Sequence, residues 1–131
     1  MTRITAFLSV RSGTLTPPEI SDLLEIDADT DVIKGSERTP PRPRPEYHGW
    51  HIDCRFDDYI DLDLAIGELA LRLGEKVENL ARLSRHEQVN EICVTIAIAP
   101  EDERVPMFFS RDTIAFLGKI GASLDIDYFP E

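Results

Sequence analysis

The sequence predicts an α+β protein, a two-layer sandwich in which helices cover one face of a mainly antiparallel sheet of four or five strands. Each predicted strand alternates apolar and polar side chains, so only one face of the sheet is expected to be buried. The chain has 131 residues, enough for one core, and we expect a single domain over residues 1–131. Its 42% hydrophobic and 30% charged residues are typical of a globular protein, which supports this fold class.

The first two predicted elements are a strand and a short helix. Residues 3–11 alternate between apolar and polar side chains, which is the period of a strand with one buried face. A capping box follows, in which Thr16 is the N-cap, Pro17 takes the first helical position and Glu19 lies three residues after the cap. The buried stripe of this helix is expected to comprise Ile20, Leu23 and Leu24.

Residues 32–47 show no periodicity and predict a loop. Within this loop, residues 34–45 form a basic segment that we call the arm. The arm contains Lys34, Arg38, Arg42 and Arg44 against one acidic residue, Glu37, and its prolines are Pro40, Pro41, Pro43 and Pro45. Because proline fixes φ and removes a backbone donor, the arm is expected to have polyproline II character.

The arm has two interpretations. In the first it is a stiff crossover whose arginines stay in water or pair with the acidic residues of 27–31. In the second it is a preformed recognition arm, since polyproline segments lose little entropy on binding and arginine grips carboxylates or phosphates. The partner-binding candidates are Arg38, Arg42, Arg44 and Trp50.

The middle of the chain predicts a strand and a long helix. Residues 49–56 alternate, with Trp50 expected to point inward and anchor the strand. In residues 57–84 the apolar side chains recur at intervals of three and four, which predicts the longest helix of the protein, packed across the sheet.

The C-terminal part predicts strands on both sides of a third helix. Residues 91–99 give the strongest strand pattern and are expected to be central, while residues 105–109 predict an edge strand, where proline is tolerated. Ser110 caps a helix that Gly121 ends, and residues 123–129 predict the last strand. The inward residues of this helix are expected to be Ile114, Leu117 and Ile120.

Polar side chains alternate onto the second face of the predicted sheet. This face is expected to gather Thr5, Phe7, Ser9, Arg11, His51, Asp53, Arg55, Cys93, Thr95, Asp125, Asp127 and Phe129. Four of these are ligand candidates, namely His51, Asp53, Asp125 and Asp127, because an imidazole and carboxylates on one face can bind a ligand or orient a general base. The alternative is a solvated face with ordinary cross-strand ion pairs.

The overall charge and the two cysteines narrow the classes of function. The formal net charge of -11 disfavours binding to nucleic acid, because phosphates require a clustered cationic surface. There is no signal peptide pattern and no apolar run long enough to cross a membrane, so we expect a cytoplasmic protein. Cys54 and Cys93 lack CxxC spacing and predict neither a disulfide nor a zinc site, and we expect no cofactor.

Several motifs together resemble a known family. They are Leu15-Thr-Pro-Pro-Glu-Ile-x-x-Leu-Leu24, Ile33-Lys-Gly35 before the arm, Gly49-Trp50, and Leu117-Gly-Lys-Ile-Gly-Ala-Ser-Leu-Asp-Ile-Asp127. Over nearly its whole length the chain resembles a family of small bacterial domains of unknown function. The resemblance implies no catalytic residue. Members of such families sometimes resemble immunity proteins against bacterial toxins, and an acidic protein suits a basic toxin.

The sequence therefore favours a non-enzymatic bacterial interaction module, immunity-like if the resemblance holds, that binds another protein through its acidic surface or its arm. The alternative is a small-ligand or metal-binding protein, with or without enzymatic activity, that uses the polar face of the sheet. No nucleophile elbow, phosphate loop or paired cysteine motif is present, so the sequence leans away from an enzyme.

Overall fold

A computed structural model describes residues 2–39, 42–100 and 104–129 of the chain. The elements follow in the order β1 (Arg3–Ser12), α1 (Pro17–Leu24), β2 (Thr30–Val32), β3 (His48–Phe56), α2 (Leu62–Leu73), the 3-10 helix η1 (Gly74–Lys76), α3 (Val77–Leu83), β4 (Val89–Ala99), α4 (Arg111–Lys119) and β5 (Ser123–Tyr128). The strands described here form one sheet in the order β2-β3-β1-β4-β5. All neighbouring pairs are antiparallel except β4 and β5, which are parallel.

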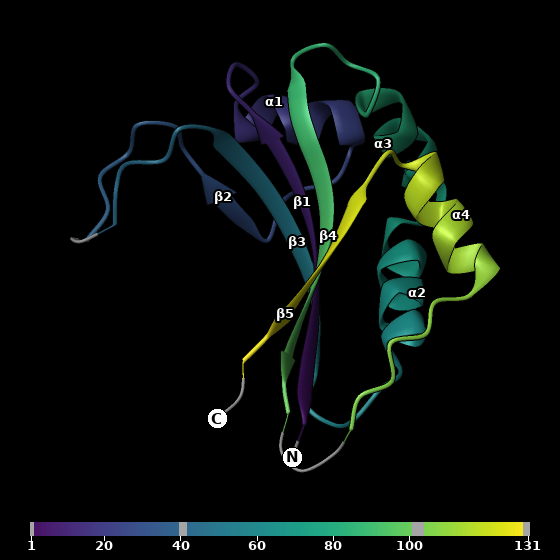
Figure 1. Ribbon diagram of the computed structural model, residues 1–131. Coiled ribbons are helices and arrows are strands. Elements are labelled where there is room, and N and C mark those ends of the chain that lie inside the picture. The colour runs from purple at the N-terminus through teal and green to yellow at the C-terminus, as the bar shows by residue number, and fades with distance from the viewer. Residues whose placement is uncertain (1, 40–41, 101–103, 130–131) are drawn as a thin grey trace.

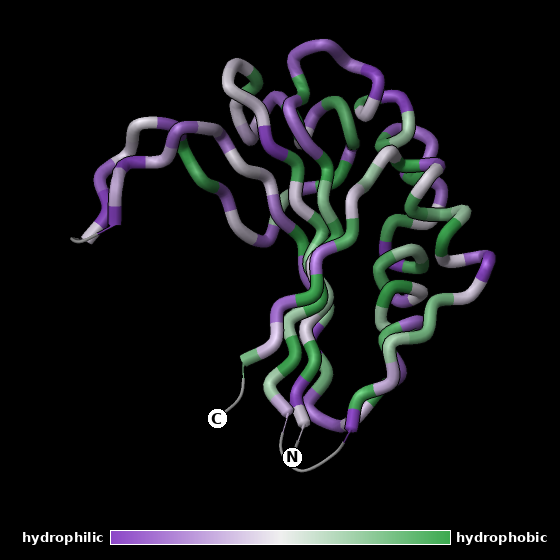
Figure 2. Tube along the Cα trace, viewed as in Figure 1, coloured by the Kyte–Doolittle hydropathy of each residue, from purple (hydrophilic) through white to green (hydrophobic). Residues whose placement is uncertain are grey.

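The helices cover one face of this sheet and leave the other face open (Figure 1). The inward side chains of β1 and β4 are almost completely buried, and α1, α2 and α3 contribute the opposite wall of the core. This arrangement confirms the predicted two-layer α+β fold with a mainly antiparallel sheet. In Figure 2 hydrophobic and hydrophilic positions alternate along the strands, whereas the described part of the arm is mostly hydrophilic and extends away from the sheet.

Trp50 lies in the core between β3 and α1. Its side chain is 0% exposed, and its indole Nε1 donates a hydrogen bond of 3.1 Å to Ser21 Oγ of α1. The capping box that starts α1 is present, because Thr16 accepts from the Glu19 backbone and the Glu19 carboxylate accepts from the Thr16 backbone. Trp50 was a partner-binding candidate, but its burial makes the side chain inaccessible to a partner, and its role is to join helix and sheet.

The predicted long helix over residues 57–84 is divided in the structure. α2 begins only at Leu62, and it ends at Gly74, whose φ of 54° lies in the left-handed region that glycine adopts readily. The chain continues through η1 into α3, which buries Leu80 and Leu83 against the core. The leucine spacing continues through the break, so periodicity alone did not reveal it.

Three further expectations differ from the structure. Residues 105–109 do not form a strand, because β5 takes the edge position beside β4 and Pro106 lacks a backbone donor. The short strand β2 was not predicted; it ends at Val32, the first residue of the predicted loop, and pairs with β3. Leu23 and Ile114, expected to be inward, are 47% and 60% exposed, since each lies on the flank of its helix beside the buried stripe.

The remaining predicted strands agree with β1, β3, β4 and β5, although β1 rather than β4 is the middle strand of the sheet. Ser110 caps α4 by accepting from the Thr113 backbone, and Gly121 follows it with φ of 65°. In the described part of the chain, none of the helices has the length and apolar character needed to cross a membrane.

Candidate functional site

The open face of the sheet is organised into rows of side chains by the strand register. Ser9 of β1 is paired with His51 of β3 on one side and with Cys93 of β4 on the other. The next row along the strands consists of Asp53, Phe7, Thr95 and Asp125, and the row after it consists of Arg55, Thr5, Ala97 and Asp127. The predicted outward residues therefore do share one face, but in a fixed order across the strands.

The arm rises from the sheet between β2 and β3. Its two ends are held together by a hydrogen bond of 2.9 Å from the Gly35 amide to the Pro45 carbonyl. Arg44 reinforces this closure, because Nη1 donates to the Gly35 carbonyl at 3.2 Å and Nη2 lies 3.5 Å from Glu37 Oε1. The arm is thus a tethered projection with a closed base, and Figure 1 shows it extending away from the helices. Pro40 and Pro41 lie outside the described residues.

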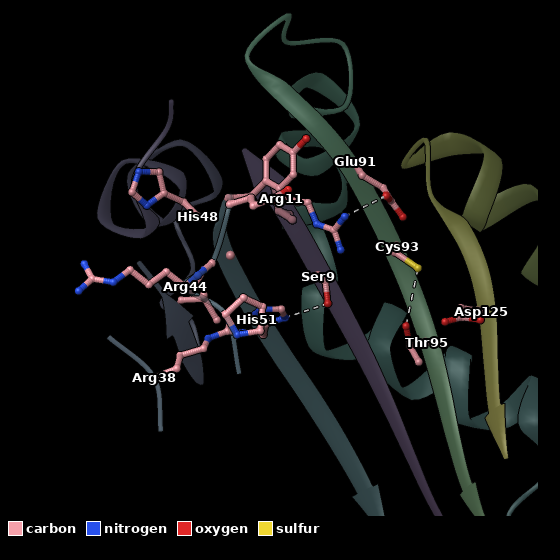
Figure 3. A pocket seen from close by; sticks show the side chains of 17 residues that line it. Ser9, Arg11, Arg38, Arg44, His48, His51, Glu91, Cys93, Thr95 and Asp125 are labelled. Carbon is pink, nitrogen blue, oxygen red and sulfur yellow. Dashed lines mark hydrogen bonds and ion pairs between the residues drawn. The ribbon is translucent and has the colours of Figure 1, made fainter. Parts of the chain in front are cut away.

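A cleft of about 520 Å³ lies between the base of the arm and the open face of the sheet. Polar and charged side chains line it, among them Arg38, Arg44, Ser9, His51, Cys93 and Asp125 (Figure 3). Two arginines of the arm and two ligand candidates of the sheet therefore share one cavity. The arm contributes the cations of one wall, whereas the carboxylates of Glu91 and Asp125 come from β4 and β5.

His51 is a half-buried titratable side chain of the cleft. Its Nδ1 shares a hydrogen bond of 2.8 Å with Ser9 Oγ across the β1–β3 pair. Its Nε2 lies over Gly49, where an added Cβ would be only 2.7 Å away, so the ring occupies space that glycine leaves. Burial lowers the pKa of His51, and the positive charge of Arg11 lowers it further. The negative charge of Asp31 acts in the opposite direction and raises this pKa. The imidazole is therefore neutral at neutral pH.

The Ser9–His51 pair resembles part of a nucleophile–base arrangement, and no third group that orients the imidazole is found among the described residues. A catalytic serine needs a base whose second nitrogen is oriented by another group. Within the described residues, Ser9 is the only hydrogen-bond partner of the His51 ring. The pair therefore acts as a polar, neutral surface that can donate to or accept from a bound molecule.

The remaining arginines of the cleft and of the arm are weakly held, or unpaired among the described residues. Arg11 lies 3.8 Å from Glu91 and 5.5 Å over the ring of Tyr47, both at the rim. The side chains of Arg38 and Arg42 have no hydrogen bond or ion pair with any described residue, so both guanidinium groups are available to a partner. The alternative in which the arm pairs with residues 27–31 is not observed there, because Arg44 uses Glu37 instead.

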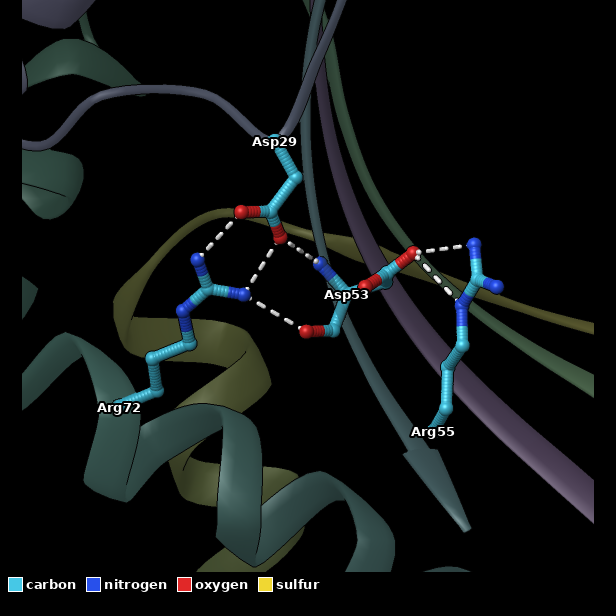
Figure 4. Close-up of polar contacts among 4 residues, drawn as sticks. All are labelled: Asp29, Asp53, Arg55 and Arg72. Atoms are coloured by element: carbon cyan, nitrogen blue, oxygen red, sulfur yellow. Dashed lines mark hydrogen bonds and ion pairs between the residues drawn. The ribbon is translucent and has the colours of Figure 1, made fainter. Parts of the chain in front are cut away.

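Asp53 and Asp127 do not lie in the cleft. The Asp53 carboxylate is 3.3 Å from Arg55, and its backbone belongs to a network formed by Asp29 and Arg72 (Figure 4). Asp53 and Asp125 occupy one row but are separated by β1 and β4, which places them about 14 Å apart. The four ligand candidates therefore do not form one site, and no group of three potential metal ligands occurs among the described residues.

Two groups at the cleft were not identified as site residues from the sequence. Glu91 and Tyr47 approach Arg11 from β4 and from the base of the arm, and both contacts depend on strand order. Alternation placed Ser9 and Cys93 on the open face, but it did not show that they flank each other. Only the pairing of β1 with both β3 and β4 brings these side chains together.

The fold and the cleft define a class of small α+β protein with one open sheet face and a basic arm above it. The chain belongs to the DUF4279 family, described as a domain of unknown function, whose family model matches residues 2–130. The comparison with curated proteins and the comparison with solved structures each found no match.

Proposed function

We propose that this protein is a non-enzymatic protein-binding module that holds a segment of a partner between the arm and the open face of the sheet. The observation that supports this most directly is the shared cleft, in which Arg38 and Arg44 of the arm face the same cavity as His51 and Asp125 of the sheet. A peptide segment needs a long, open, polar surface, and the open face beside the base of the arm is of this kind.

The distribution of charge describes the segment that fits. Arg38 offers an unpaired guanidinium on the arm side within the described residues, and Asp125 offers a carboxylate on the β5 side. A segment across the cleft would place an acidic group near Arg38 and a basic group near Asp125. The closed base at Gly35 and Pro45 limits the freedom of the arm before binding, which reduces the entropy lost on association.

The net charge of -11 supports a partner that is basic as a whole. Opposite net charges raise the rate of association and suppress acidic competitors. A basic toxin is one partner of this type, in line with the resemblance to immunity proteins. The arm then contributes local specificity, while the acidic body contributes the long-range attraction.

The experiment uses the full chain as bait to isolate a partner, which is then purified so that its Kd can be measured by calorimetry. The test variant replaces Arg38, Arg42 and Arg44 by alanine, and the control replaces Arg85, Arg104 and Arg111, three exposed arginines outside the arm. The arm variant is expected to weaken binding by at least about tenfold, corresponding to about 1.4 kcal/mol. The control makes the protein more acidic by the same amount and is expected not to weaken binding to a basic partner. Equal Kd values for the arm variant and the unmodified protein would refute the proposal.

A small ligand is the second candidate, because the cleft volume of about 520 Å³ lies in the range of small-molecule sites. A panel of small anions and zwitterions would be screened by thermal shift, with native mass spectrometry after zinc addition as the metal test. A stabilising compound whose effect disappears in His51→Ala but persists in Arg42→Ala would favour this candidate. The absence of any retained compound or metal would leave the protein-binding function preferred.

A further inference from the structure

A second interaction surface lies at the edge of the sheet formed by β5. β5 pairs with β4 on one side, and in the described part of the chain no strand pairs with its other side. Figure 1 shows β5 running in front of the other strands, with α4 on the helix side of the sheet. A free strand edge is a template for an added strand, because its backbone donors and acceptors are unsatisfied by the sheet.

The backbone groups on this free edge can be identified. The Phe129 amide donates to the Ile98 carbonyl at 2.8 Å, so the backbone of Phe129 faces β4. Because successive residues of a strand direct their backbone groups to opposite sides, Ser123, Asp125 and Asp127 also face β4. The amides and carbonyls of Leu124, Ile126 and Tyr128 therefore point to the free edge, which offers three donors and three acceptors.

The side chains of β5 indicate the composition of the strand that fits. On the helix side, Leu124 and Ile126 are only half-buried and Tyr128 is 48% exposed, so the apolar layer is incompletely covered there. On the open face, Asp125 and Asp127 present two carboxylates two residues apart. An added strand is favoured when apolar residues continue the first row and lysine or arginine residues lie beside the two aspartates.

The same carboxylates disfavour a second copy of this chain. If two β5 strands paired antiparallel about Ile126, Asp125 of each copy would lie opposite Asp127 of the other copy. A shift by two residues in either direction, which keeps the apolar side chains on one face, still places identical aspartates opposite each other. Like charges directly opposite each other destabilise a strand pair, so dimerisation through two β5 edges is disfavoured.

We propose that the free edge of β5 binds an extended, amphipathic segment of another protein, with basic and apolar residues in alternation, by adding it as a strand to the sheet. This interaction is distinguishable from the proposed function of the cleft, because Asp125 is shared by both surfaces whereas Asp127 and the free-edge residues Leu124, Ile126 and Tyr128 do not line the cleft. It also differs in kind, since main-chain pairing supplies the binding and the carboxylates select the sequence.

The test uses a synthetic peptide of alternating lysine and valine as the probe and amide hydrogen exchange by NMR as the readout. Binding is expected to slow exchange at Leu124, Ile126 and Tyr128 by at least about tenfold, while Ser123, Asp125 and Asp127 change much less because they already face β4. A glutamate–valine peptide and a lysine–valine peptide N-methylated on its pairing edge are the controls. Neither is expected to protect the three amides.

Variants separate this edge from the cleft. Asp127→Lys is expected to weaken lysine–valine binding by about tenfold, whereas the alanine variant of Arg38, Arg42 and Arg44 is expected to leave it unchanged. Tyr128→Pro removes one free-edge donor without touching the β4 ladder and is also expected to weaken binding. The proposal is overturned if the probe gives no protection at the three amides, if the arm variant rather than Asp127→Lys weakens binding, or if sedimentation shows β5-dependent self-association.

Discussion

The salt bridge between Arg72 of α2 and Asp29, which precedes β2, is predicted to be the polar interaction on which the edge of the sheet most depends. Nη1 and Nη2 of Arg72 lie 2.6 and 2.7 Å from the two oxygens of Asp29, and Nη1 also donates to the Asp53 carbonyl at 2.6 Å (Figure 4). The Asp53 amide donates back to Asp29 at 2.9 Å. One guanidinium thus connects the helix layer, β3 and the segment before β2.

The magnitude follows from the geometry and the exposure. Replacing Arg72 by methionine keeps the aliphatic part of the side chain but removes three hydrogen bonds, and a buried bond to a charged group contributes about 1.5–3 kcal/mol. Both side chains of the ion pair are 35% exposed, so water replaces much of what is lost. We therefore expect a loss of about 1.5–2.5 kcal/mol in the free energy of unfolding.

The assay is urea denaturation at pH 7 with Arg55→Met as the matched control. Arg55 contacts the Asp53 carboxylate at 3.3 Å, but its side chain is 77% exposed, so its loss should cost less than about 0.5 kcal/mol. A double-mutant cycle with Asp29→Asn isolates the coupling between Arg72 and Asp29. If Arg72→Met and Arg55→Met destabilise equally, the network is not cooperative and the reasoning fails.

The same network predicts a pH dependence. Arg72 holds the pKa of Asp29 below its usual value. Because the folded pKa is depressed, the stabilisation is complete above the unfolded pKa of about 3.9 and is lost as the pH falls through the folded pKa. The difference in stability between the unmodified protein and Arg72→Met should therefore shrink as the pH is lowered below about 3.9.

Three further predictions concern the cleft and the core. Gly49→Ala is expected to displace the His51 ring from Ser9 and to move the pKa of His51 towards its usual value, at a cost in stability under about 1 kcal/mol. An NMR titration of His51 measures this change, and an unchanged titration would contradict the prediction. Since the pKa of His51 is lowered, stability should decline as the pH falls below about 6.5, and His51→Gln should remove that part of the decline in denaturation experiments. Trp50→Phe should cost about 1–3 kcal/mol by losing the hydrogen bond to Ser21 and packing volume, and the emission of native Trp50 should be blue-shifted because the indole is buried.

The elements with strong local signals were predictable from the sequence. Thr16 and Ser110 each cap the helix that the sequence placed after them, because capping depends on residues within one turn. The alternation in residues 3–11 and 91–99 matches β1 and β4, since a strand with one buried face shows its period directly.

The features that depend on distant contacts were not predictable in this way. β2 is three residues long, and it is a strand only because β3 lies beside it. Gly74 ends α2 with a positive φ of 54° although the leucine pattern continues beyond it. Residues 105–109 have the composition of a strand, but the edge of the sheet is already occupied by β5.

The candidate site was predictable as a face but not as a cavity. Alternation placed His51, Asp53 and Asp125 on the same side of the sheet, and the structure agrees. It could not show that β1 and β4 separate Asp53 from Asp125, because strand order is set by pairing between distant segments. Nor could it show that Arg38 and Arg44 of the arm line the same cleft as His51, since that depends on the path of the chain between β2 and β3.

The position of β1 in the middle of the sheet has a consequence for how the chain is made. β1 precedes the other described strands in the chain and pairs with β3 and with β4, so both its edges are satisfied only after residues up to Ala99 have been synthesised. Such distant pairing is slow to form, and until then the nascent chain exposes one unpaired edge of β1. A chain that stops before Val89 is therefore expected to aggregate rather than to give a smaller folded unit.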